Sequence, residues 1–150
     1  MVDISTKVPT ARHAQVECLV RMGPEAFEAV LRESLAKGDL FTVAKLAGIQ
    51  AAKRTAELIP LCHPLALEHL DVSFEPDQAG CAIRLVADVT ATAKTGVEME
   101  AFVAVSISAL AVYDMVKAID PGATITDLQL ICKTGGKQAF ERRVTCAQPL

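Results

Sequence analysis

The sequence predicts an α+β fold in which an antiparallel sheet has helices packed on one face. Three observations support this: the patterns follow the order β, α, α, β, β, α, β, β, two strand patterns flank a short turn, and the hydrophobic residues are mainly aliphatic. Hydrophobic residues make up 51% of the chain and aromatic residues only 4%, with no Trp. The core is therefore expected to consist of Ala, Val, Leu and Ile.

Local signals place the elements in order. Pro24 suits the first turn of a helix, Asp39 is a good N-cap, and Pro60 forbids a helix from continuing. The predicted elements are a strand at 14–22, a helix from Pro24 to Gly38, a helix from Asp39 to about Leu58, strands on both sides of a turn at Pro76–Gly80, a helix from about Gly96 to Ile119, and strands near 124–132 and 138–146. This order favours a ferredoxin-like domain with additions, and the absence of a linker or repeat predicts a single domain over residues 1–150.

Charge and cysteine content narrow the class of protein. The net charge of −3 and the pI near 5.6 argue against a nucleic-acid or membrane surface, although a pocket for a small anion needs only local cations. The N-terminus has no apolar core of signal-peptide length, so we expect a cytoplasmic protein. Five cysteines without a C-x-x-C pair indicate neither a disulfide framework nor a zinc knuckle.

The predicted long helix contains a run, Ala101–Val112, whose only polar side chains are serines. The run is too short to span a bilayer, and one sheet can cover only one side of the helix. We therefore expect a homo-oligomer with this helix at or near a subunit contact. A large loop folding over the helix is the alternative.

Charged residues flank this apolar run. Thr95 and Glu98 have the spacing of a capping box, and Glu100 lies where a helix dipole favours an anion. Asp114 and Lys117, three residues apart, could form an ordinary surface ion pair, or a coupled, pKa-shifted pair that transfers protons. Glu100 and Asp114 are separated by about 21 Å along a helix. If both serve one site, the ligand is long or the site lies between subunits.

Two loops are further candidates. For the segment PLCHP, a zinc site is disfavoured because the sequence supplies too few further ligands. A nucleophilic pair of Cys62 and His63 is disfavoured because neighbouring side chains in an extended loop point in opposite directions. His63, stiffened by two prolines, could bind a base or move a proton, or could be an ordinary loop histidine. The segment ICKTGGKQAF could expose backbone N–H groups and lysines to phosphate, or could be a simple hairpin turn.

Four segments occur in a characteristic order and spacing: GDLFTVAKLAGIQAAKRTAELIPLCHPL, KTGVEMEA, YDMVKA and KTGGK. Together they closely resemble the cyclic pyranopterin monophosphate synthase family of molybdenum cofactor biosynthesis, from about Met1 to Lys137. The resemblance implies a ferredoxin-like fold and a homohexamer, a trimer of dimers, with active sites at subunit interfaces. It also implies a lyase that converts 3′,8-cyclo-7,8-dihydroguanosine 5′-triphosphate to cyclic pyranopterin monophosphate and pyrophosphate.

The resemblance implies roles for particular residues. Asp114 is expected to be the catalytic acid/base with Lys117 as its partner. The residues expected to bind substrate are Leu61, Cys62, His63, Glu98, Met99, Glu100, Lys37, Lys53, Lys133, Lys137 and Arg12. No redox cofactor or protein-bound metal is expected, and Mg²⁺ could accompany the triphosphate. Rival hypotheses are a nucleotide or pterin sensor without turnover, and a helix that serves assembly alone.

Overall fold

A computed structural model describes residues 1–142 and contains five strands and four helices. In chain order the elements are β1 (Thr10–Arg21), α1 (Pro24–Leu31), α2 (Leu40–Ala52), α3 (Thr55–Leu58), β2 (His69–Asp77), β3 (Ala82–Ala93), α4 (Glu98–Val116), β4 (Thr124–Thr134) and β5 (Phe140–Glu141). The predicted α+β class is confirmed.

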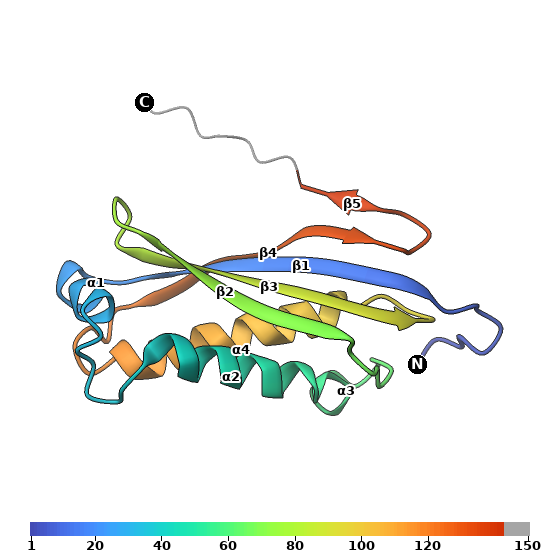
Figure 1. The fold of residues 1–150 in the computed structure, drawn as a ribbon, viewed down its shortest axis with the longest axis horizontal. Helices are drawn as coiled ribbons and strands as arrows, with labels where there is room; N and C mark the ends of the chain where they lie inside the picture. The colour runs from blue at the N-terminus through green and yellow to red at the C-terminus, as the bar shows by residue number, and fades with distance from the viewer. Residues whose placement is uncertain (143–150) are drawn as a thin grey trace.

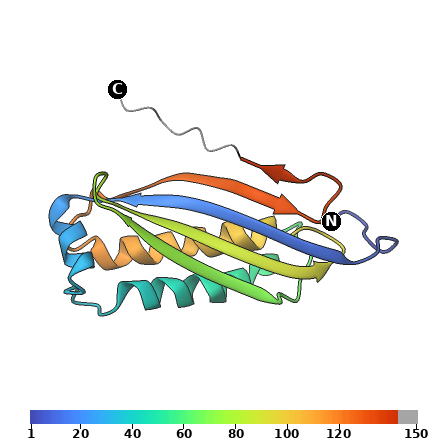
Figure 2. The ribbon, with the colours of Figure 1, turned by 45° about the horizontal axis from the view of Figure 1, so that its top comes forward.

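The five strands form one antiparallel sheet in the order β2-β3-β1-β4-β5. Figure 1 shows α2 and α4 side by side under one face of the sheet, and Figure 2 shows the opposite face open. The strands β1 to β4 with the intervening helices follow the split βαβ order of a ferredoxin-like fold. The added elements are β5, α1 and the short α3.

The core lies between the sheet and the helix layer. Alternate residues of β1 and β3 are fully buried, including Val16, Val20 and Leu85. Helix α4 packs against β1, β3 and α2, and the Ser108 hydroxyl donates to the Ala44 carbonyl oxygen of α2 at 2.9 Å. By length and composition alone α4 could cross a membrane, but here it is the central core helix of the layer.

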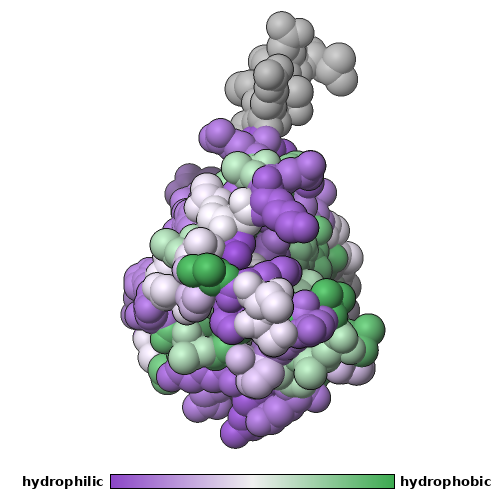
Figure 3. All heavy atoms as spheres, turned by 90° about the vertical axis from the view of Figure 1, so that its right-hand side faces the viewer, coloured by the Kyte–Doolittle hydropathy of each residue, from purple (hydrophilic) through white to green (hydrophobic). Residues whose placement is uncertain are grey.

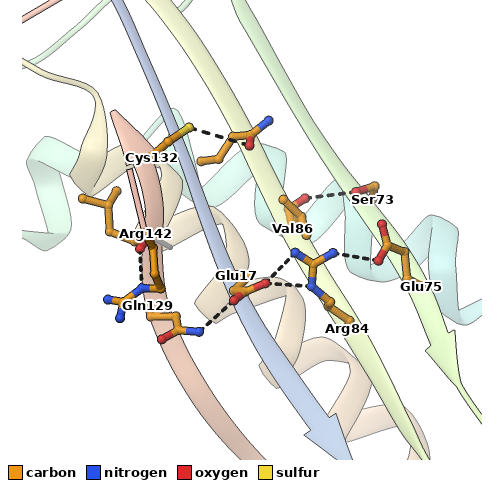
Figure 4. A network of polar contacts seen from close by, with 10 residues as sticks. Glu17, Ser73, Glu75, Arg84, Val86, Gln129, Cys132 and Arg142 are labelled. Carbon is orange, nitrogen blue, oxygen red and sulfur yellow. Dashed lines mark hydrogen bonds and ion pairs between the residues drawn. The ribbon is translucent and has the colours of Figure 1, made fainter. Parts of the chain in front are cut away.

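The open face of the sheet is polar. Glu17 on β1 accepts from Arg84 of β3 and from Gln129 of β4, each at 2.7 Å, and Arg84 also donates to Glu75 of β2 (Figure 4). Four adjacent strands are therefore linked by side-chain hydrogen bonds on the side without helices. This agrees with the prediction that helices cover one face.

The first helix ends earlier than its apolar spacing predicts. It was expected to reach Gly38, but α1 ends at Leu31 because Glu33 adopts a positive φ of 52°. The Ser34 N–H donates to the Ala29 carbonyl and the Glu33 N–H to the Val30 carbonyl, which is the Schellman ending of a helix. The apolar residue Leu35 is still buried, from a turn and not from a helix.

The second predicted helix is divided in two. Its start is confirmed, because Asp39 accepts a hydrogen bond from the Thr42 N–H. The chain leaves the helix after Ala52, where the buried Thr55 hydroxyl donates to the Ala52 carbonyl at 2.8 Å, and α3 follows. A side chain that satisfies this carbonyl allows the break, and periodicity does not reveal it.

Several boundaries also differ from those predicted. The strand β1 begins at Thr10, because its polar first residues pair with the end of β3. Helix α4 begins at Glu98 with Val97 as its N-cap and no side-chain capping hydrogen bond. The prediction of a Thr95–Glu98 capping box is therefore wrong. The last strand, predicted near 138–146, is found only as β5, and residues 143–150 lie outside the described residues.

Candidate functional site

The predicted site residues fall into two clusters at opposite ends of α4. Glu98, Met99 and Glu100 are in its first turn, and Asp114 is in its last turn. Since α4 is one continuous helix, these groups stand about 21 Å apart along its axis. Figure 1 shows α4 extending between the end that carries the N-terminal arm and the end that carries α1.

A cavity of about 430 Å³ opens at the N-terminal end of α4. One wall is the proline-flanked loop, another is the start of α4, and a third is the N-terminal arm, residues 1–9. The lining residues are Val2, Ile4, Lys7, Leu61, Cys62, His63, Leu65, Thr95, Gly96, Glu98, Met99 and Glu100. Figure 3 views this end of the molecule, where hydrophilic side chains surround smaller hydrophobic patches.

The Cys62–His63 loop behaves differently from an extended strand. Cys62 and His63 line the same cavity, because the Cys62 N–H donates to the Ile59 carbonyl and turns the chain. The argument from opposite side-chain directions therefore does not hold here. The pKa of the Cys62 thiol is raised, first by burial and then by the Glu100 carboxylate, so Cys62 is a protonated wall residue at neutral pH.

Glu100 is the buried carboxyl group of this cavity. Its residue is only 4% exposed, and its pKa is raised by burial and, less strongly, by the charge of Glu98. No ion pair to Glu100 occurs within residues 1–142. A carboxyl group of this kind can hold or release a proton closer to neutral pH than an exposed one can.

Glu100→Gln should stabilise the protein at neutral pH. Because the folded state binds the Glu100 proton more tightly than the unfolded chain does, stability is complete below the ordinary pKa of 4.5 and falls as pH rises through the raised value. The uncharged amide does not ionise, so the variant keeps this stability at neutral pH. The free energy of unfolding that wild type loses is about 1.4 kcal/mol for each pH unit by which the pKa is raised. Urea unfolding at pH 4 and pH 7.5 measures the difference.

Glu57→Gln on the exposed surface of α3 serves as the control and should leave stability unchanged at both pH values. A Glu100→Gln protein less stable than wild type at pH 7.5 would contradict the assignment of Glu100 as a buried carboxyl with a raised pKa.

A second, cationic cavity of about 310 Å³ adjoins the first. It is lined by Arg12, Gly96, Glu98, Lys133, Thr134, Gly136, Lys137 and Gln138. Glu98 and Gly96 line both cavities, so the two form one bipartite site. A Cβ atom on Gly96 would lie 1.8 Å from a carboxylate oxygen of Glu98, so a side chain at this position would displace that carboxylate.

Glu98 holds the main ion pair of the cationic cavity. Its carboxylate accepts from Lys133 at 2.8 Å. Partial burial would raise the pKa of Glu98, but the hydrogen bond and charge of Lys133 outweigh it, with help from Arg12, and the pKa is lowered. Glu98 is therefore an anion within a cationic cavity.

The loop that contains Gly135 and Gly136 is held against β1. Gly135 has a φ of 82°, and a Cβ atom there would lie 1.8 Å from the Ala11 carbonyl oxygen. The Thr10 hydroxyl donates to the Gly135 carbonyl at 2.9 Å. This close approach brings the loop lysines beside Arg12, so the predicted hairpin turn and the cationic cavity are the same segment.

Asp114 lies between two lysines at the other end of α4. Lys37 Nζ is 2.5 Å and Lys117 Nζ is 2.6 Å from its carboxylate oxygens, and Lys37 also donates to the Asp114 carbonyl. The hydrogen bonds from Lys117 and then Lys37 lower the pKa of Asp114 to about 2, and the pKa of Lys117 is raised in return. The predicted contact between Asp114 and Lys117 is present, with both side chains half exposed as in a surface ion pair, and Lys37 is a third member.

One chain therefore brings together twelve of the thirteen predicted residues in two places, the bipartite site and the Asp114 cluster, and leaves one apart. Lys53 is the exposed C-cap residue of α2 and lines neither cavity. The sequence did not reveal the contributions of Lys7 or Gly96. Gly96 stands within the quoted segment KTGVEMEA, whereas no pattern around Lys7 distinguishes it from an ordinary polar terminus.

Metal ligands do not gather in the described part of the chain: residues 1–142 contain no group of three or more His, Cys, Asp or Glu side chains placed to hold an ion. His63 has no such companions.

The fold and the two adjoining cavities define the class, a ferredoxin-like α+β protein with a bipartite, partly cationic site. Residues 1–136 match the MoaC family. Similar proteins, each called cyclic pyranopterin monophosphate synthase, come from Geotalea uraniireducens (50% identical over 143 residues, 95% of this chain and 89% of that protein) and Trichodesmium erythraeum (52% over 137 residues, 91% and 82%). The chain belongs to the MoaC family.

Proposed function

We propose that the protein is a lyase of molybdenum cofactor biosynthesis that converts 3′,8-cyclo-7,8-dihydroguanosine 5′-triphosphate to cyclic pyranopterin monophosphate and pyrophosphate. The observation that carries this proposal is the pair of adjoining cavities that share Glu98. The first offers His63 and the buried Glu100 to a purine-derived ring system. The second offers Arg12, Lys133 and Lys137 to a triphosphate, and its cations stabilise the charge that develops as pyrophosphate leaves.

Asp114 supplies proton transfer in this proposal, with Lys117 as its partner. With both lysines bound to it, Asp114 is a weak base, because its pKa of about 2 is far below neutral pH. A phosphate group that draws Lys37 or Lys117 away would remove one hydrogen bond and raise the Asp114 pKa. The substrate would then activate its own acid/base group.

The distance between the two clusters favours a site shared by two subunits. An apolar groove of about 370 Å³ beside the first cavity supports this arrangement, since Met99 lines both. The groove is formed by Leu58, Ile59, Met99, Phe102, Val103, Ser106, Ile107 and Leu128. Further along α4, Leu110 is 52% exposed. A second copy packed on this surface could bring its Asp114 to the first chain's cavity, within a trimer of dimers.

The remaining parts of the proposal concern cofactors and location. The rearrangement and cyclisation are net proton transfers and a displacement at phosphorus, so we expect no redox cofactor, with Mg²⁺ bound through the triphosphate. We expect no nucleic-acid or membrane partner, and a cytoplasmic location.

Incubation of the purified protein with the cyclised nucleotide tests the proposed reaction. We expect stoichiometric formation of cyclic pyranopterin monophosphate, observed by mass spectrometry, and of pyrophosphate, observed by a coupled phosphatase assay. Incubation with GTP serves as the control and should yield neither product, because its purine and sugar are not joined by the extra ring. Recovery of the cyclised nucleotide unchanged would contradict the proposal and favour a sensor.

A further inference from the structure

The N-terminal arm, residues 1–9, forms a wall of the first cavity. Val2, Ile4 and Lys7 line the cavity opposite the first turn of α4 and the proline-flanked loop. The arm precedes β1 and has no helix or strand of its own. A ligand bound in this cavity would therefore contact the arm.

The arm is a compact turn with a single side-chain attachment to the body. The Ser5 N–H donates to Asp3 at 2.8 Å, and the Lys7 N–H donates to the Ile4 carbonyl at 3.1 Å. Lys94 Nζ donates to the Ser5 carbonyl at 2.9 Å, which is the one side-chain hydrogen bond between residues 1–9 and the rest of the described chain. Such an attachment can open and close, because few contacts must be broken.

Lys7 gives the arm an uncommitted positive charge. Within residues 1–142 it forms no ion pair, whereas Lys133 is paired with Glu98 and Lys37 with Asp114. Lys7 also faces a cavity whose other charged residues are acidic, Glu98 and Glu100. A cation of this kind is available to an anionic oxygen of a ligand without first breaking another pair.

We propose that Lys7 is a further substrate-binding residue, which contacts an anionic oxygen of the bound nucleotide, and that Lys94 is a positioning residue that holds the arm across the cavity. This inference rests on the proposed function and adds a closing wall to its site. Thr95 and Gly96, which follow Lys94 directly, also line the cavity, so the attachment and the binding surface belong to one segment.

Kinetics of Lys7→Met and Lys7→Arg test the binding role. Loss of one charge-assisted hydrogen bond should raise KM roughly ten-fold to a hundred-fold in Lys7→Met, with kcat much less affected, and arginine should restore most of the affinity. Lys45→Met is the matched control, because Lys45 pairs with Asp71 and lines neither cavity. A wild-type KM in Lys7→Met, or an equal loss in Lys7→Arg, would overturn the role of Lys7.

Hydrogen exchange tests the positioning role of Lys94. In the Asp114→Asn protein, which should bind substrate without turnover, added substrate should slow exchange in the peptide that covers residues 1–9. Adding Lys94→Met should speed that exchange and raise KM in the otherwise wild-type enzyme. Unchanged exchange and KM in the Lys94 variant would overturn its role. If the wild-type protein turns over substrate while the arm variants behave normally, this inference fails and the proposed function stands.

Discussion

Replacing Asp114 with asparagine should lower the rate of pyrophosphate release by at least about a hundred-fold, since positioned acid/base groups contribute on the order of 10²–10⁴ in rate. The amide keeps the shape of the side chain but can neither accept nor deliver the proton. Asp114 is half exposed and joined to flexible lysines, so its loss should hardly change the thermal midpoint. Initial rates with the cyclised nucleotide and a thermal melt measure both quantities.

Asp71→Asn is the matched control for this variant. Asp71 is similarly exposed and pairs with Lys45, but it lies on β2 away from both cavities. Its rate should remain within about two-fold of wild type, as expected for a surface ion pair. A near-normal rate in Asp114→Asn would show that Asp114 does not carry the proton transfer.

Mixing two inactive variants should restore activity if the site is shared. Asp114→Asn keeps its His63 cavity, and His63→Ala keeps its Asp114, so an interface between the two chains contains one intact site and one doubly defective site. Half of the random two-chain interfaces are mixed, and each mixed interface holds one intact site of two. About a quarter of wild-type activity should therefore return.

The assay uses differently tagged variants that are co-expressed, with mixed assembly verified by native mass spectrometry. Each variant mixed with itself is the control and should remain inactive. If verified mixed oligomers show no more activity than the mean of the two single variants, the site is not shared between subunits. A single chain would then have to supply both the His63 cavity and Asp114 to one site.

The order of elements was predictable because each depends on local signals. Pro24, Asp39 and Pro60 are constraints that act within one or two turns, and their effects appear in α1, α2 and the loop that follows α3. Boundaries that depend on distant partners were not predictable. The start of β1 is set by pairing with β3, and the break after Ala52 depends on a buried threonine hydroxyl.

The site shows the same division between local and distant effects. The Asp114–Lys117 contact follows from helical spacing, and the structure contains this ion pair. Lys37 joins Asp114 from 77 positions away, a contact that only folding creates. The family resemblance implied that Lys37 binds substrate, but did not predict this contact. The separate location of Lys53 and the position of Lys7 in the cavity wall also depend on tertiary structure, which periodicity does not encode.

The ion pair between Glu98 and Lys133 has a consequence for selectivity. In the ligand-free protein Glu98 acts as a built-in competitor, because any phosphate that seeks Lys133 must first displace this carboxylate. Free inorganic phosphate offers nothing to the neighbouring cavity and gains little from the exchange. A ligand that fills both cavities at once would offset the free energy lost with the Glu98–Lys133 ion pair, because its ring system gains contacts in the first cavity. We therefore expect the site to bind small inorganic anions such as phosphate weakly, a form of specificity by rejection.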